Sequence, residues 1–169
     1  MKHKFLLIYA WFVRTILFFL PDIPFIMRFR GWLYGLGMRK RGRDFQVTHN
    51  TIIKSLQNIE VGNNVFIGNF SVILAAANVI VHDEVQIGPN VIIISGNHTK
   101  LNGSYRFGKP DREEIILERG SWVSANCTIA KGSMLPSGSV LAANSLLNKK
   151  HTTKDGIYGG VPAKLLKKE

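Results

Sequence analysis

Aliphatic residues recur every six positions along most of this chain. Residues 59–76, 79–96 and 115–150 divide into twelve hexads, and the third residue of every hexad is Val, Ile or Leu. These residues are Val61, Ile67, Ile73, Val81, Ile87, Ile93, Leu117, Val123, Ile129, Leu135, Leu141 and Leu147. The sixth residue is Gly or Asn in eight of the hexads, and these two residue types tolerate the positive φ of a tight corner.

A period of six matches neither a helix nor the two-residue alternation of a strand. It is typical of a short strand of about four residues that is followed by a tight corner. Three such units close a triangular coil, so eighteen residues make one turn. The aliphatic third positions then stack in columns inside the prism, where each coil buries its apolar side chains against its neighbours. The repeat therefore predicts an all-β solenoid.

The repeat also divides the chain. We expect the solenoid to cover residues 46–150, with an irregular first coil. Residues 97–114 break the repeat completely and contain two glycines and a proline, so they predict a loop that projects from the solenoid. Loops on a rigid scaffold often carry function. Residues 151–169 should leave the prism as a short C-terminal helix or a tail.

The first 45 residues form an apolar and basic segment of predicted helix. Residues 5–20 are interrupted only by Arg14 and Thr15, and the segment carries nine Lys and Arg against two Asp. Apolar helices beside basic residues are typical of a peripheral anchor on an anionic membrane. The alternative is that the helices pack on the solenoid or on a neighbouring subunit. We expect no nucleic-acid partner, because the basic residues are interleaved with bulky aliphatics and no recognition motif is present.

The repeat and the C-terminal stretch GSWVSANCTIAKGSMLPSGSVLAANSLLNKK, with the later GVPAK, resemble the hexapeptide-repeat acyltransferases. The likeness is greatest to the O-acetyltransferases of maltose, galactosides and capsular sugars. It implies a left-handed parallel β-helix, acetyl-CoA as the co-substrate, no metal, and a homotrimer with its active sites between subunits. Together with the apolar, basic N-terminus, it suggests a cytoplasmic enzyme at the inner face of a bacterial membrane.

Two residues are the candidates for catalysis. His98 stands at the root of the predicted loop, and an imidazole can take the proton of an alcohol that attacks a thioester. The resemblance assigns the same role to a histidine at this place. It also matches Asn69, which lies 29 residues earlier in GNFSVI, to an asparagine that binds the acceptor or the oxyanion.

The resemblance also implies a wall that binds coenzyme A. The matching residues are Trp122, Ser124, Ala125, Ala142 and Ala143, with Lys149 and Lys164 as candidates for the phosphates. Small residues would leave room for the pantetheine arm. The family often has glycine at the places of Ser124 and Ala142, so this wall is bulkier than usual.

The function expected from these features is acetyl transfer to a sugar hydroxyl of a surface polysaccharide or a lipid-linked glycan. An amino-sugar N-acetyltransferase is the close alternative, because the same base serves an amine. A catalytically silent scaffold is the alternative from another class. A zinc lyase on this solenoid would need three histidine ligands, and no histidine lies between His98 and His151. Cys127, the single cysteine, occupies a packed position of the repeat.

Overall fold

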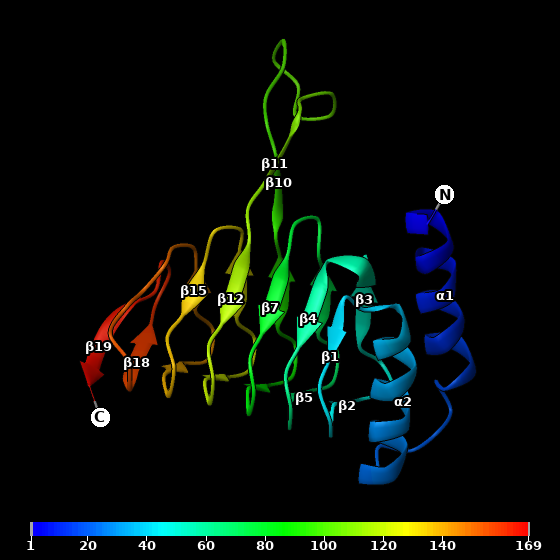
Figure 1. Cartoon of the computed structure of the whole chain (residues 1–169). Coiled ribbons are helices and arrows are strands. Elements are labelled where there is room, and N and C mark those ends of the chain that lie inside the picture. The colour runs from blue at the N-terminus through cyan, green and yellow to red at the C-terminus, as the bar shows by residue number, and fades with distance from the viewer. Residues whose placement is uncertain (1, 169) are drawn as a thin grey trace.

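The computed structural model describes residues 2–168 and shows a parallel β-solenoid of about six turns with two helices at its N-terminal end (Figure 1). Each complete turn contributes one short strand to each of three sheets, and the strands of successive turns pair in parallel. We call these the first, second and third sheet in the order in which the chain meets them, and we number the corner after each sheet in the same way.

The strands of each sheet stack in sequence order along the solenoid. The first sheet contains β1 (Lys40–Arg41), β4 (Ile59–Val61), β7 (Val79–Val81), β12 (Ile115–Leu117) and β15 (Met134–Leu135). The second contains β2 (Gln46–Val47), β5 (Phe66–Ile67), β8 (Gln86–Ile87), β13 (Trp122–Val123), β16 (Val140–Leu141), β18 (Gly156–Gly159) and β19 (Lys164–Lys168). The third contains β3 (Ile52–Lys54), β6 (Val72–Leu74), β9 (Ile92–Ile94), β14 (Thr128–Ala130) and β17 (Leu146–Leu147).

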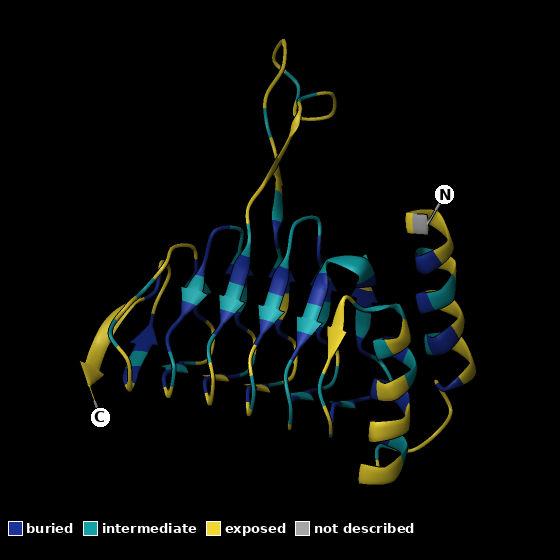
Figure 2. Cartoon of the chain, in the orientation of Figure 1, coloured by how far each residue is buried: buried dark blue, intermediate teal, exposed yellow. Residues whose placement is uncertain are grey.

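The predicted columns form the core of the solenoid. All twelve third-position residues are at most 2% exposed, and Figure 2 shows buried segments in dark blue along the strands of the solenoid. Seven of the eight glycines and asparagines at the sixth position have positive φ, and only Gly96 does not. Phe70 and Glu84 adopt positive φ at the same kind of corner, at 61° and 62°. The hexad pattern is therefore confirmed in both its inward positions and its corners.

The solenoid begins six residues before the expected boundary at residue 46. Lys40 and Arg41 form β1, which pairs in parallel with Glu60 and Val61 of β4. Both residues of β1 are exposed, so this strand depends on its hydrogen bonds to β4 rather than on buried side chains. The 3₁₀ helix η1 (Leu56–Asn58) closes this first turn.

Helices α1 (Lys2–Ile16) and α2 (Pro24–Gly37) cover the N-terminal end of the solenoid (Figure 1). Each helix contacts the other, and both contact the first turn. Leu6, Ala10, Val13, Leu17 and Tyr34 are buried in this contact. The apolar segment is therefore helical, as the sequence predicted, and one face of it packs on the solenoid. Neither helix, nor any other in the described part, is long and apolar enough to span a bilayer.

The C-terminal segment neither leaves the prism nor forms a helix, contrary to expectation, because its strands extend the second sheet. β18 adds a parallel strand beside β16, and β19 returns antiparallel to β18. All five residues of β19 are exposed, so its conformation follows from pairing with β18 rather than from a hydrophobic pattern. Residues 97–114 do project from the solenoid, as Figure 1 shows. They form a hairpin whose arms are β10 (Gly96–His98) and β11 (Pro110–Arg112).

Candidate active site

His98 is the last residue of β10, at the base of the projecting hairpin. It lies opposite Pro110 of β11 in the antiparallel pair, and its side chain is exposed. The chain reaches the hairpin from β9 of the third sheet and leaves it for β12 of the first sheet. His98 therefore stands at the third corner of the prism, with its imidazole open to a substrate.

The hairpin is held to the next turn by an ion pair. Lys131 Nζ lies 2.9 Å from an oxygen of Asp111 and 3.7 Å from an oxygen of Glu113. The hydrogen bond to Asp111 raises the pKa of Lys131. Asp111 pairs with Asn97, the neighbour of His98, so this contact fixes the base of the hairpin that carries the imidazole.

Asn69 lies at the second corner, between β5 and β6. Its side chain is half-buried, and its Oδ1 is buried without a hydrogen-bond partner among the described residues. The third sheet separates this corner from His98, so the two residues are on the order of 15 Å apart from strand geometry. One chain does not bring the two predicted catalytic residues together at a single acceptor.

Most of the predicted coenzyme A residues lie around the same second corner. Ala125 and Ala143 occupy the corner in successive turns, where the backbone N–H of Asn144 donates to the carbonyl of Ala125. Ser124 and Ala142 precede them, and Trp122 is on the outer face of the second sheet with 49% of its surface exposed. Lys164 begins β19 opposite Gly159, at the same edge. Lys149 differs, because it follows β17 and lies at the third corner.

Burial decides how much of each predicted wall residue a ligand could contact. Ser124 is only 8% exposed, which leaves little of its side chain for a ligand. Ala125 and Ala142 are half-buried, and Ala143 is exposed. The accessible part of the proposed wall is thus Trp122, Ala125, Ala142 and Ala143.

Other chemistries find little support in the described residues. Cys127 is fully buried, and burial raises the pKa of its thiol, which makes the thiolate scarce at neutral pH. Within residues 2–168 no cluster of three His, Cys, Asp or Glu side chains is placed to hold a metal ion.

His49, for which the sequence pattern indicates no role, lies at the same corner as Asn69 in the neighbouring turn. Val47 pairs with Ile67 and Ile52 pairs with Val72. The four-residue corner 48–51 is therefore in register with the corner 68–71, and each residue lies beside the residue twenty positions later. The offset that relates these two corners could have been counted from the sequence. The partner that holds the His49 ring, Asp22, could not, because it lies in the connection between the helices.

Solved structures of hexapeptide-repeat acetyltransferases have the same solenoid fold as this chain. A solved acetyltransferase of this kind from Vibrio cholerae O1 biovar eltor, in complex with acetyl coenzyme A, superposes with a TM-score of 0.83. It is 22% identical, and the match covers 98% of this chain and 87% of that one. A maltose O-acetyltransferase from Clostridium difficile 630 has a TM-score of 0.82 at 21% identity and covers 98% and 88%.

The sequence comparison gives a more particular relative. WbbJ of Escherichia coli (strain K12), whose assignment as a lipopolysaccharide biosynthesis O-acetyl transferase is itself provisional, is 24% identical over 115 residues. The match covers 63% of this chain and 58% of that protein, so this chain spans little more than half the length of its curated relative. No model of a protein family matches the chain.

Proposed function

We propose that this protein is an acetyl-CoA-dependent O-acetyltransferase that acts on a sugar hydroxyl. The observation that carries the proposal is the agreement of fold over 98% of the chain with an acetyltransferase that was solved with acetyl-CoA. The exposed His98 at the base of the hairpin supplies the base that this reaction needs. The likeness to WbbJ supports an acceptor in surface polysaccharide synthesis.

The mechanism is direct transfer from the thioester to the acceptor. His98 takes the proton of the sugar hydroxyl while the hydroxyl oxygen attacks the carbonyl carbon of acetyl-CoA. The tetrahedral oxyanion then collapses, the carbon–sulfur bond breaks, and the proton passes to the departing thiolate. The side-chain amide of Asn69 donates a hydrogen bond to the acceptor or to the oxyanion, and such a donor contributes roughly 3 kcal/mol to the transition state.

No covalent acetyl-enzyme is part of this mechanism. The buried Cys127 has a raised thiol pKa, and its Sγ lies 3.1 Å from the carbonyl oxygen of Ala142. A thiol in this position is neither ionised nor accessible to the thioester.

The enzyme acts as a homotrimer in this proposal. The outer face of the third sheet is mainly apolar, with Lys54 and Thr128 as its polar members, and includes Ile52, Val72, Leu74, Ile92, Ile94, Ala130 and Leu146. A contiguous apolar face of this kind is typical of an interface. A ring of three copies would set the second corner of one subunit beside the third corner of the next. Asn69 and the coenzyme A wall of one chain would then face His98 of its neighbour.

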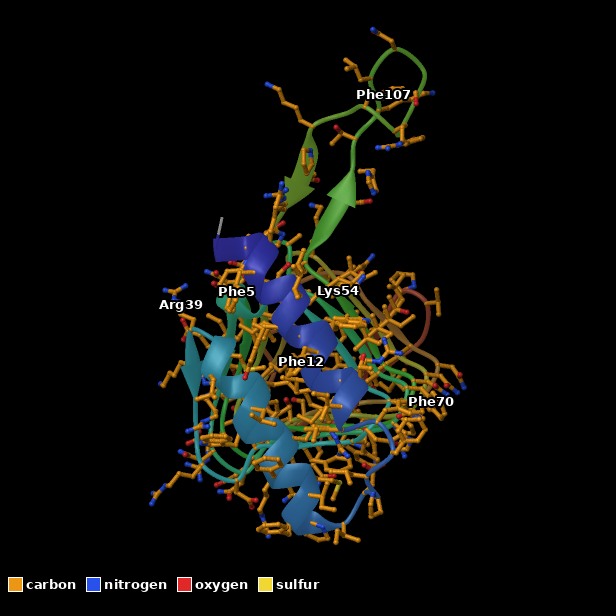
Figure 3. The ribbon with its side chains drawn as sticks, turned by 90° about the vertical axis from the view of Figure 1, so that its right-hand side faces the viewer. Phe5, Phe12, Arg39, Lys54, Phe70 and Phe107 are labelled. Atoms are coloured by element: carbon orange, nitrogen blue, oxygen red, sulfur yellow. The ribbon has the colours of Figure 1, made fainter. Side chains whose placement is uncertain are left out.

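The N-terminal cap binds an anionic membrane in this proposal. Phe5, Ile8, Phe12, Ile16 and Phe19 are exposed at helical spacing on α1 and its C-terminal end. They form a second apolar stripe beside the buried one. Figure 3 looks onto this end of the solenoid, with Phe5 and Phe12 on α1.

Helix α2 carries a similar exposed stripe, and basic residues surround both helices. The exposed apolar residues of α2 are Phe25, Phe29, Trp32 and Leu36, and the exposed basic residues nearby include Lys4, Arg28, Arg39, Lys40, Arg41 and Arg43. Short helices that lie in the plane of the interface bind by this combination of apolar area and positive charge. A membrane location at the cytoplasmic face would bring the site close to a lipid-linked glycan.

The test is acetylation of a defined acceptor. The purified protein is incubated with acetyl-CoA and a panel of p-nitrophenyl glycosides, and free thiol release is measured with and without each glycoside. We expect glycoside-dependent thiol release and a product heavier by one acetyl group. If only the glycosides of amino sugars are acetylated and the neutral glycosides are not, the enzyme catalyses N-acetyl transfer instead. Thiol release that no glycoside increases would contradict the proposal.

A further inference from the structure

A second histidine, His49, lies at the second corner directly beside Asn69. The two corners are in register, as described above, so the Cα atoms of His49 and Asn69 are about 5 Å apart, the usual spacing of neighbouring strands. A side-chain hydrogen bond links the same two corners, because the backbone N–H of Phe70 donates to Oδ1 of Asn50 at 3.1 Å. Figure 3 shows Phe70 at the edge of the solenoid, toward the C-terminal end of α1.

The His49 ring is held in one orientation by the connection between α1 and α2. Its Nδ1 lies 2.7 Å from Oδ2 of Asp22, and the other oxygen of Asp22 accepts a hydrogen bond from the backbone N–H of His49 at 2.9 Å. Since a carboxylate only accepts hydrogen bonds, Nδ1 carries the proton. Phe18 meets the ring edge-on, with 5.5 Å between centroids.

Asp22 is itself fixed by a buried cation. Arg30 is 1% exposed and donates to Oδ1 of Asp22 at 3.0 Å. Its guanidinium also donates to the carbonyl oxygens of Leu17, Leu20 and Val47. Burial lowers the pKa of Arg30, while the Asp22 charge opposes that shift. The chain therefore uses a buried, multiply bonded arginine to position the carboxylate that orients His49.

This arrangement leaves one nitrogen of His49 available to a ligand. The His49 side chain is 33% exposed, and Nε2 has no hydrogen-bond partner in the part of the chain that the structure describes. An imidazole that is anchored through Nδ1 and open at Nε2 is organised to bind a hydroxyl group. Asn69 offers its amide from the next turn, so the two side chains can engage neighbouring hydroxyl groups of one sugar ring.

We propose that His49, positioned by Asp22 and Arg30, is an acceptor-binding residue that forms with Asn69 a subsite for a polyhydroxylated sugar. The inference rests on the proposed function. It adds to that function a specificity-determining residue, and a reason why the N-terminal helices and the solenoid are joined at this corner.

Two substitutions of His49 separate the contact of Nδ1 with Asp22 from the proposed contact of Nε2 with the sugar. The amide nitrogen of asparagine takes approximately the place of Nδ1, so His49→Asn keeps the bond to Asp22 and removes the outer group. The amide nitrogen of glutamine takes approximately the place of Nε2, so His49→Gln keeps the outer group. His82→Asn is the matched control, because His82 is an exposed histidine at the first corner.

The experiment measures kcat and KM of these variants with p-nitrophenyl glycosides and acetyl-CoA, together with their melting temperatures. We expect His49→Asn to raise the KM for the glycoside at least tenfold, with the KM for acetyl-CoA and the melting temperature unchanged. His49→Gln should stay closer to the parent in glycoside KM, and His82→Asn should match the parent throughout.

A glycoside KM within twofold of the parent in His49→Asn would overturn the inference and leave His49 as a structural contact. A lowered melting temperature with unchanged KM values would do the same. The parent and His98→Ala are measured alongside. A parent that acetylates no glycoside refutes the proposed function and the subsite together, whereas an active parent with an insensitive His49→Asn refutes the subsite alone.

Discussion

Replacing Ile87 with aspartate should unfold the solenoid, because this side chain lies in the middle of an inward column. Ile87 is 0% exposed, and its strand pairs with Ile67 on one side and Val123 on the other. Burying an isoleucine side chain stabilises a fold by about 1.5–3 kcal/mol. A carboxyl group that is buried without a partner costs roughly a further 1–3 kcal/mol even when it is neutral.

The sum, about 2.5–6 kcal/mol, is a large part of the whole stability of a typical domain, which is about 5–15 kcal/mol. The penalty should also grow with pH. Burial would raise the pKa of the new carboxyl in the folded state, so unfolding would release a proton and become more favourable as the pH rises. Ile87→Val should cost only about 0.5–1.5 kcal/mol, because a single methylene group is lost.

Gln86→Asp is the matched control, since Gln86 is the other residue of β8 and is exposed. A surface substitution of this kind usually changes stability by less than about 0.5 kcal/mol. Urea denaturation followed by circular dichroism compares the four proteins. If Ile87→Asp unfolds at the same urea concentration as Gln86→Asp, the assignment of inward and outward positions is wrong.

Two further predictions concern the surfaces. The variant with Phe5, Phe12 and Phe25 all changed to serine should bind anionic vesicles at least tenfold more weakly in a flotation assay. Each substitution removes apolar area at the bilayer and leaves the buried core residues intact. Equal flotation of parent and variant, or no flotation of either at low salt, would count against the membrane proposal. Ala143→Trp should raise the KM for acetyl-CoA at least tenfold without changing the circular dichroism spectrum, since Ala143 is an exposed part of the proposed wall; an unchanged KM would place coenzyme A elsewhere.

The regular part of the fold could be predicted because each hexad repeats the same short strand and the same tight corner. A buried aliphatic such as Ile129 and a corner residue such as Asn126, with φ of 60°, each carry a signal within six residues. The ends of the solenoid carry no such signal. β1 and β19 consist of exposed residues, and they become strands only because a neighbouring strand offers hydrogen bonds. Counting hexads could therefore not locate them.

The site was less predictable than the fold. Counting hexads from the sequence would have shown that Asn69 and His98 occupy different corners, because Asn69 precedes a strand of the third sheet and His98 follows one. The contact between Asp22 and His49 could not be derived in this way. The two residues are 27 positions apart, and they meet only because α1 and α2 pack on the first turn. The repeat says nothing about how the helices dock.

The most direct test of the proposed function is the rate of thiol release by His98→Ala with a glycoside that the parent acetylates. Removing a general base typically lowers the rate about 100- to 10,000-fold. We expect a loss in this range, with acetyl-CoA binding intact by isothermal titration calorimetry. A variant that keeps near-parental turnover on the same glycoside would contradict the role of His98.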